Sequence, residues 1–251
     1  MKKYNKLLNL ALPLVTVLCL ILLWAVASIL VGSEYILPSV LTTLKALLEL
    51  LKEGKFYIAF LLTLLRSLVA FIISFVIAGG LAVMAYKSKV LERLILPLVS
   101  ITRSLPTIAI VLLLLFWTNE QVAPVIVTLL VVMPTAYTQL KNALDSVDYS
   151  SVEAGMVDGA NKKQLFLFVQ FPQIEPALYS TIGSGIALNF KLMVAAEVLS
   201  ATVKSLGNLL NSAKFNGEIA GMLAIVFLTV LLGMLIEFAF NKLAEKKGSW
   251  R

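Results

Sequence analysis

Histidine is absent from this 251-residue sequence, and cysteine occurs once, at Cys19. A single thiol cannot form a disulfide within the chain, which excludes the class of small disulfide-stabilised domains. Without imidazoles, a zinc site of the His/Cys kind is not expected, and Ser-His-Asp or Cys-His catalysis within the chain is excluded. Charged residues make up only 14% of the sequence, well below the share of about 25% in soluble domains. These absences point away from secreted scaffolds and soluble enzymes.

Apolar residues make up 60% of the sequence, which excludes intrinsic disorder and indicates an integral membrane protein. A helix needs about 20 mostly apolar residues to cross about 30 Å of hydrocarbon. We therefore predict an all-α, polytopic membrane protein that forms one transmembrane domain over residues 1–251. The sequence contains about six stretches of suitable length, at residues 8–31, 57–86, 94–118, 122–140, 177–200 and 219–241.

The distribution of basic residues predicts the topology. If both termini are cytoplasmic, 13 of the 21 Lys and Arg residues lie in inside segments, 5 lie outside, and 3 lie in or beside the spans. The positive-inside rule thus favours cytoplasmic termini, and it accounts for the net charge of +7 without a nucleic-acid partner. The N-terminus is similar to a signal peptide, but its long apolar run favours an uncleaved first helix.

Two segments between the predicted spans have patterns of their own. Residues 38–56, on the predicted outer side, carry apolar side chains at helical spacing with Lys and Glu between them. This pattern is typical of an amphipathic helix that lies on the membrane surface. The longest predicted cytoplasmic loop covers about residues 141–175.

The cytoplasmic loop is predicted to form a helical hairpin. Ser150 or Ser151 can cap a first helix, and a second short helix begins near Asn161. Pro172 and Pro176 are then expected to separate this hairpin from the fifth span. Exposed small and aromatic residues on such a hairpin are typical of a docking site for a soluble partner.

The same loop carries a motif. Glu153-Ala154, Gly159-Ala160 and Pro172 resemble the EAA loop of permease subunits of ABC importers. In that pattern a glycine follows the glutamate by six residues and a Leu-Pro pair lies near the end. Gly159 and Pro172 occupy these positions in register.

The sequence departs from the pattern at Gly155, where a second Ala is usual, and at Phe171, where Leu is usual. Both replacements are small or apolar. Further segments resemble, in the correct order, the nitrate, sulfonate and taurine branch of these permeases, a group that also includes permeases for thiamine-precursor pyrimidines. These segments are residues 37–39, 63–68, 79–80, 97–106, 195–198 and 206–207.

The resemblance implies a type I ABC importer permease-like fold without enzymatic activity. Two permease copies, expected to be identical, would form the substrate pathway, and an extracellular or periplasmic binding protein would deliver the cargo. Two separate ATPase subunits would supply ATP and Mg²⁺ chemistry, because this chain lacks a Walker A pattern; no cofactor or metal is expected in the chain itself. The predicted ATPase-docking residues are Glu153, Ala154, Gly155, Asp158, Gly159, Ala160, Phe166 and Pro172. The alternative is an ordinary surface hairpin.

Charged residues near the spans are candidates for a pathway or gate. Lys191 lies within the fifth predicted span, where a charge usually faces protein or water. It either attracts an anionic substrate group, or pairs with another helix, or reaches the cytoplasmic side. Glu197 follows it by about 600° of helix, so the two are not expected to pair, and Glu197 is interpreted as a packing or gate residue. Arg103 either lines an inner gate or contacts lipid phosphate, whereas Arg66 and Glu237 are expected to be interfacial.

The cargo implied by the resemblance is a small anion, such as a sulfonate, taurine or a nitrate-like ion, or a thiamine-precursor pyrimidine. Two other classes remain as alternatives. A secondary transporter or channel not driven by ATP would not need the EAA-type loop, and no inverted repeat is evident. A membrane-embedded enzyme would need a catalytic cluster, which the residue types in the spans do not provide.

Overall fold

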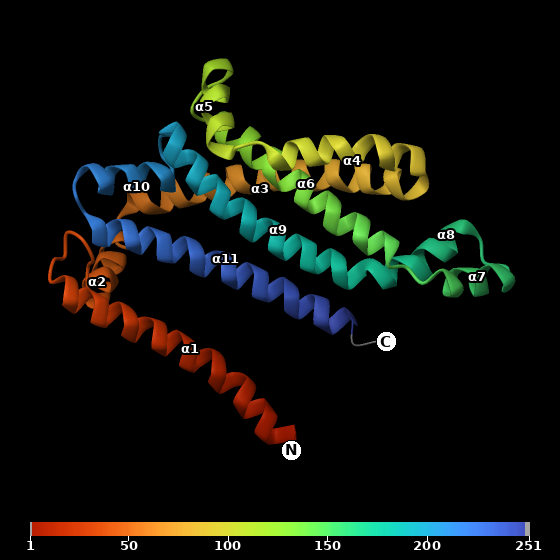
Figure 1. The fold of residues 1–251 in the computed structure, drawn as a ribbon, viewed down its shortest axis with the longest axis horizontal. Coiled ribbons are helices and arrows are strands. Elements are labelled where there is room, and N and C mark those ends of the chain that lie inside the picture. The colour runs from red at the N-terminus through yellow and green to blue at the C-terminus, as the bar shows by residue number, and fades with distance from the viewer. Residues whose placement is uncertain (1, 249–251) are drawn as a thin grey trace. The chain divides into compact units, whose positions relative to one another are not determined.

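The structure, a computed structural model, describes the backbone of residues 2–248, with side chains from Leu12 onward except Pro13 and Leu14. Within this range every regular element is a helix (Figure 1). The elements are α1 (Lys2–Val31), α2 (Val40–Leu50), α3 (Gly54–Lys87), α4 (Lys89–Ser104), α5 (Thr107–Trp117), α6 (Ala123–Asp145), α7 (Tyr149–Val157), α8 (Lys162–Gln164), the π-helix η1 (Leu165–Gln170), α9 (Phe171–Ser200), α10 (Leu206–Phe215) and α11 (Ile219–Gly248). The predicted all-helical fold is confirmed.

Four helices are long and apolar enough to cross a membrane: α3, α6, the continuous helix Lys162–Ser200, and Ile219–Lys247 in α11. The bent pair of α4 and α5 makes a fifth if it counts as one span, and α1 contributes a shorter apolar stretch, Val15–Val31. The polytopic membrane class is confirmed, with four to five candidate spans among the described residues where the sequence predicts about six.

The third predicted span, residues 94–118, is not one straight helix. α4 ends at Ser104 and α5 begins at Thr107, with a bend of 92° between them. Leu105 is extended, with φ −68° and ψ 130°, the conformation that a residue before proline favours for steric reasons. Pro106 thus divides the apolar stretch into two helices.

Pro172 and Pro176, in contrast, do not interrupt the chain. α8, η1 and α9 form one continuous helix of 39 residues, Lys162–Ser200. The π-helical turns of η1 end at Gln170, two residues before Pro172, and a proline in a helix removes one amide–carbonyl bond. The predicted separation of the hairpin from the fifth span is therefore wrong.

The chain forms two compact units, Met1–Tyr57 with Leu209–Leu228 and Ile58–Asn208 with Thr229–Arg251. The first unit contains α2, which lies inside the segment predicted to be amphipathic. The Ser39 side chain caps α2 by accepting a hydrogen bond from the backbone N–H of Thr42 at 3.1 Å.

The second unit holds the main helix bundle. α6 and α9 pack together most extensively, and α4 and α5 both contact α6. Buried Ala78, Ala82 and Ala85 of α3 lie in one core cluster with residues of α4 and α6, since small side chains let helices approach closely. Gly185 has the same role: a methyl group there would lie 2.6 Å from the Phe71 ring.

Candidate functional site

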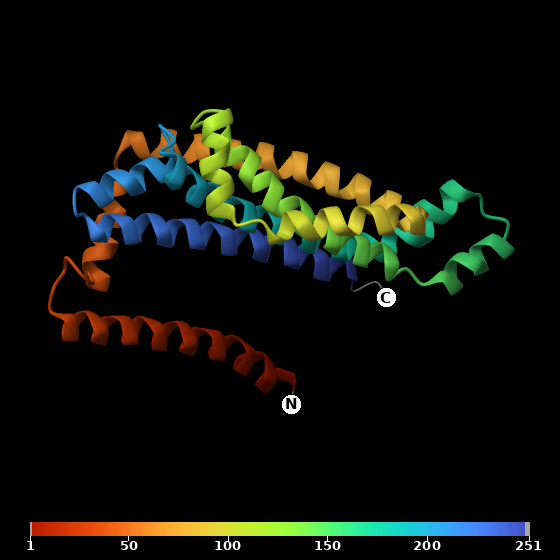
Figure 2. The same cartoon turned by 45° about the horizontal axis from the view of Figure 1, so that its top comes forward.

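The segment between α6 and α9 folds into a helical hairpin, residues 149–170, in which α7 is one arm and α8 with η1 is the other. Figures 1 and 2 show it extending beyond the ends of α6 and α9. Val152 and Leu165 are buried between the two arms. A methyl group at Gly155 would lie 2.6 Å from Leu165 Cδ2, so the glycine that departs from the EAA pattern allows the arms to pack closely.

Asp148 caps the first arm. Its carboxylate accepts hydrogen bonds from the Ser150 backbone N–H at 3.0 Å and from the hydroxyls of Ser150 and Ser151 at 2.8 and 2.6 Å. The prediction that a serine is the cap is wrong, because both serines donate to the stronger carboxylate acceptor one turn earlier. These bonds, led by that of the Ser151 hydroxyl, hold the pKa of Asp148 below its usual value.

We expect replacement of Asp148 by alanine to loosen the first arm, with severalfold faster amide exchange at Ser150 and Ser151. Asp148→Asn is the matched control, because asparagine is an equally good cap, and it should preserve the protection. Since the folded-state pKa is lowered, the stabilisation by the carboxylate is complete above the unfolded pKa and is lost as pH falls through the folded pKa. Hydrogen exchange followed by mass spectrometry measures both effects, and equal exchange in the two variants would contradict the capping role.

The turn between the arms depends on Gly159. This residue has φ +81°, in the left-handed region that glycine favours. The backbone N–H of Ala160 donates to the Gly155 carbonyl at 3.0 Å, which closes the end of α7. A side chain at Gly159 would meet nothing within 4 Å, so within this chain the glycine is required by its backbone angle.

The hairpin exposes large apolar side chains although it lies outside the main bundle. Val157 is 88% exposed and Phe168 is 76% exposed. A groove of about 750 Å³ lies between the hairpin and the start of α9. An ion pair of 2.9 Å between Lys247 and Glu175 lies at this groove.

The structure brings part of the predicted docking set together. Ala154, Gly155, Asp158 and Pro172 line the groove. The remaining predicted residues lie elsewhere on the hairpin: Glu153, Gly159 and Phe166 are exposed, and Ala160 is half-buried. Val157, which the sequence analysis did not select, is the most exposed large apolar residue of the hairpin.

Glu197 lies at the opposite end of α9 from the hairpin and is fully buried. Its carboxylate pairs with Arg66 Nη1 at 3.1 Å and accepts a bond of 2.8 Å from the Thr63 hydroxyl. The backbone N–H of Gly207 also donates to it, at 3.5 Å. Arg66 is half-buried in α3 and bonds both Glu197 and Gln121; its interfacial position stays a prediction. This geometry supports the packing role for Glu197 that the sequence left open.

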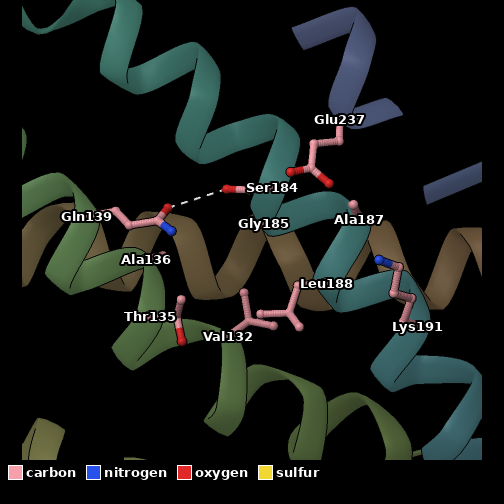
Figure 3. A pocket seen from close by; sticks show the side chains of 10 residues that line it. All are labelled: Val132, Thr135, Ala136, Gln139, Ser184, Gly185, Ala187, Leu188, Lys191 and Glu237. Atoms are coloured by element: carbon pink, nitrogen blue, oxygen red, sulfur yellow. Dashed lines mark hydrogen bonds between the residues drawn. The ribbon is translucent and has the colours of Figure 1, made fainter. Parts of the chain in front are cut away.

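Lys191 faces a cavity of about 230 Å³ between α6, α9 and α11 (Figure 3). Gln139 and Ser184 also line it, and the Ser184 hydroxyl donates to the Gln139 side-chain oxygen at 3.5 Å. Glu237 of α11 also lines this cavity. The interfacial position that the sequence analysis expects for Glu237 stays a prediction.

Arg103 lies in the last turn of α4, directly before the bend. Its guanidinium Nη2 donates to the Thr138 hydroxyl of α6 at 2.9 Å, and the side chain is otherwise exposed. Lys191, Glu197 and Arg103 therefore occupy three separate places, and only Lys191 lines the cavity.

Comparison with known proteins agrees with this architecture. The family described as binding-protein-dependent transport system inner membrane component matches residues 75–248. Similar proteins include the formylaminopyrimidine transport permease protein ThiX of Halalkalibacterium halodurans, 24% identical over 240 residues that cover 95% of both chains. The taurine transport system permease protein TauC of Escherichia coli is 24% identical over 237 residues, covering 90% of this chain and 84% of TauC. The riboflavin transport system permease protein RibX of Chloroflexus aurantiacus is 27% identical over 206 residues, 80% of this chain and 75% of RibX.

Solved structures with a similar fold are also ABC transporters. A chain of the MetNI methionine ABC transporter in an inward-facing conformation aligns with a TM-score of 0.64 and 22% identity, over 74% of this chain and 93% of that one. A chain of a bacterial alginate ABC transporter, in complex with an alginate pentasaccharide-bound periplasmic protein, aligns with a TM-score of 0.60 and 14% identity, over 98% and 96%. The chain therefore belongs to the family of binding-protein-dependent transport system inner membrane components, and it is a non-catalytic, multi-pass inner-membrane permease component of an ABC importer.

Proposed function

We propose that the hairpin of residues 149–170 is the surface on which a separate ATPase subunit docks, and that its movement couples ATP hydrolysis to transport. The observation that carries this proposal is the exposure of large apolar side chains on the hairpin: Val157 at the end of α7 is 88% exposed and Phe168 of η1 is 76% exposed. Large apolar patches on a segment exposed to water indicate a binding surface. The groove lined by Ala154, Asp158 and Pro172 adds a concave contact surface next to these apolar side chains.

The proposal requires the hairpin to be cytoplasmic. Figure 1 shows the α3–α4 turn, the α6–α7 connection and the end of α11 at the hairpin end of the bundle. Lysine and arginine residues are frequent there: Lys87, Lys89, Arg93, Lys141, Lys162, Lys163, Lys242, Lys246 and Lys247. Since cytoplasmic loops carry the excess of basic residues, this end of the second unit is assigned to the cytoplasm. The basic residues Lys2, Lys3 and Lys6 assign the N-terminus to the same side by the same rule.

The working importer would contain two ATPase subunits, a second, identical permease and a binding protein on the outer side. Each permease would contribute one hairpin, so each ATPase would have one docking site. The α2 helix, Val40–Leu50, is assigned to the outer surface, where Leu41, Leu44 and Leu48 are exposed on a single helix face.

We infer a small organic anion, such as a sulfonate or taurine, or a thiamine-precursor pyrimidine as the cargo. The similarity to permeases named for formylaminopyrimidine and taurine transport supports these classes. Lys191 is the pathway residue that the geometry favours, because it lines a cavity within the bundle. Arg103, beside the α4–α5 bend, is assigned to the inner gate, and Glu197 to the closed outer end of the bundle.

Replacement of Val157 by aspartate is the sharpest test of docking. The side chain projects away from the chain, so the variant should fold and unfold as the parent protein does. Burying a carboxylate against an ATPase is expected to weaken binding by about tenfold or more. The measurement is copurification of the ATPase from native membranes, followed by ATP hydrolysis in nanodiscs.

Val203→Asp is the matched control, because Val203 is also exposed (49%) and lies between α9 and α10, away from the hairpin. It should bind the ATPase as the parent does. Full ATPase recovery with Val157→Asp, or equal loss with both variants, would refute the docking surface.

A further inference from the structure

The cavity between α6, α9 and α11 carries groups of opposite charge. Lys191 lies at one part of its lining and Glu237 at another, and Thr135, Gln139 and Ser184 supply neutral polar groups (Figure 3). Val132 and Leu188 complete an apolar part of the wall. A small volume that combines apolar surface with a few polar groups is typical of a binding site for a small molecule.

Neither charge is satisfied by the protein. Among the described residues, Lys191 and Glu237 form no ion pair with each other or with another side chain. Other charges of the bundle are paired: Glu197 bonds Arg66, and Lys141 bonds Glu92 at 3.0 Å. Unpaired charges within membrane-spanning helices are costly and mark pathways for ions or polar solutes. Lys191 and Glu237 are therefore available to pair with charged groups of a solute in this cavity.

The helix register places the two charged side chains at neighbouring turns of α11. A methyl group at Gly233 would lie 3.0 Å from Lys191 Cε, so the lysine stem lies on this glycine of α11. A methyl group at Gly183 would lie 3.6 Å from Glu237 Cα. Gly233 and Glu237 are one helical turn apart on α11, so the glycine that the lysine stem contacts and the Glu237 backbone are offset by about 6 Å along the helix axis.

We propose that this cavity binds a small zwitterionic solute, with its acidic group at Lys191 and its amino group at Glu237. Two opposite charges that project from neighbouring turns, about 6 Å apart along the axis, favour a compact solute whose acid and amine are joined by a short carbon chain, as in β-amino acids and aminosulfonates. The Ser184 hydroxyl and the Gln139 amide, which line the same cavity, can bond polar groups of the solute as well. This assignment rests on the proposed function as a permease and narrows its cargo, because an inorganic anion would leave Glu237 unpaired beside it.

Thiol labelling at Ser184 tests the site without knowledge of the native cargo. Ser184→Cys is introduced into a Cys19→Ser background, in the full chain with its copurified partners in nanodiscs. The reagents are an anionic sulfonatoethyl and a cationic trimethylammonioethyl methanethiosulfonate. We expect Lys191→Gln to slow the anionic reagent and Glu237→Gln to slow the cationic reagent, each by about three- to tenfold.

Protection identifies the ligand class. β-Alanine and γ-aminobutyrate should slow labelling by both reagents, whereas propionate and propylamine at the same concentration should not. Lys242→Gln and Glu245→Gln are matched controls, because both residues are exposed on α11 away from the cavity. These controls should leave both rates unchanged.

Three results would overturn the proposal: no labelling by either reagent, labelling that is insensitive to Lys191→Gln and Glu237→Gln, or protection by propionate that equals protection by β-alanine. Absence of protection by both zwitterions overturns it as well. ATP is not needed for labelling, so the outcome is separable from coupling. Charge-dependent labelling in a complex whose Val157→Asp variant keeps its ATPase would retain the cavity site and refute the docking surface.

Discussion

Replacement of Glu197 by alanine is expected to lower the free energy of unfolding by about 3–5 kcal/mol, because it removes one partner of a buried ion pair. The carboxylate is fully buried and joins three parts of the second unit: Thr63 and Arg66 on α3, its own helix α9, and Gly207 at the start of α10. Without this carboxylate, Gln121 is the remaining hydrogen-bond partner of the half-buried Arg66 guanidinium among the described residues. Equilibrium unfolding in mixed micelles measures the loss.

Two variants separate the charge from the hydrogen bonds at Glu197. Glu197→Gln preserves the shape and part of the hydrogen bonding, so its loss of stability should be smaller. Glu245→Ala removes an exposed carboxylate from α11 and should change stability by less than about 0.5 kcal/mol. A loss for Glu197→Ala no larger than that for Glu245→Ala would exclude a structural role for the pair.

The second large effect is expected from Gly207→Ala. A methyl group at Gly207 would lie 2.5 Å from both Glu197 Cβ and the Val198 backbone nitrogen, and 2.6 Å from the Glu197 carbonyl carbon. Backbone atoms cannot move aside as a flexible side chain does, so α10 must shift away from α9. We expect a loss of about 3 kcal/mol or more, together with a weaker Gly207–Glu197 hydrogen bond.

Gly80→Ala is the matched glycine control. Gly80 lies in the interior of α3, and a methyl group there would meet nothing within 4 Å. Alanine is the better helix former by about 0.5–1 kcal/mol, so this variant should be slightly more stable than the parent. Thermal unfolding of the two variants side by side should give shifts of opposite sign. Shifts of the same sign would mean that the close approach at Gly207 does not limit stability.

The sequence predicts the helices of this fold well because hydrophobic length alone marks a candidate membrane helix. It predicts the interruptions poorly. Pro106 breaks a span, whereas Pro97, Pro134 and Pro172 lie inside continuous helices, so a proline in the sequence does not by itself predict a break. α10 was missed for a related reason, since Leu206–Phe215 is short and only partly apolar.

Side-chain partners were the least predictable feature. Arg66 and Glu197 are 131 residues apart, and no local pattern connects them. The Asp148 cap could have been found, because an aspartate before a Ser-Ser pair is a strong cap signal. The sequence places Glu237 near the end of a predicted span and does not indicate a binding role. Glu237 lines the cavity with Lys191 because α11 packs beside it.

The uninterrupted helix Lys162–Ser200 has a mechanical consequence. With 39 residues, it is a rod about 58 Å long that begins in the hairpin and ends beside Glu197. Rigid rods transmit rotation as well as displacement, so a twist applied at Phe168 turns Lys191 about the same axis. The π-helical turns of η1 help to set the angle about the helix axis between Phe168 and Lys191. Each residue added to or removed from the intervening helix changes this angle by about 100°. A rotation of the hairpin is thus transmitted to the cavity through the longest of the described helices.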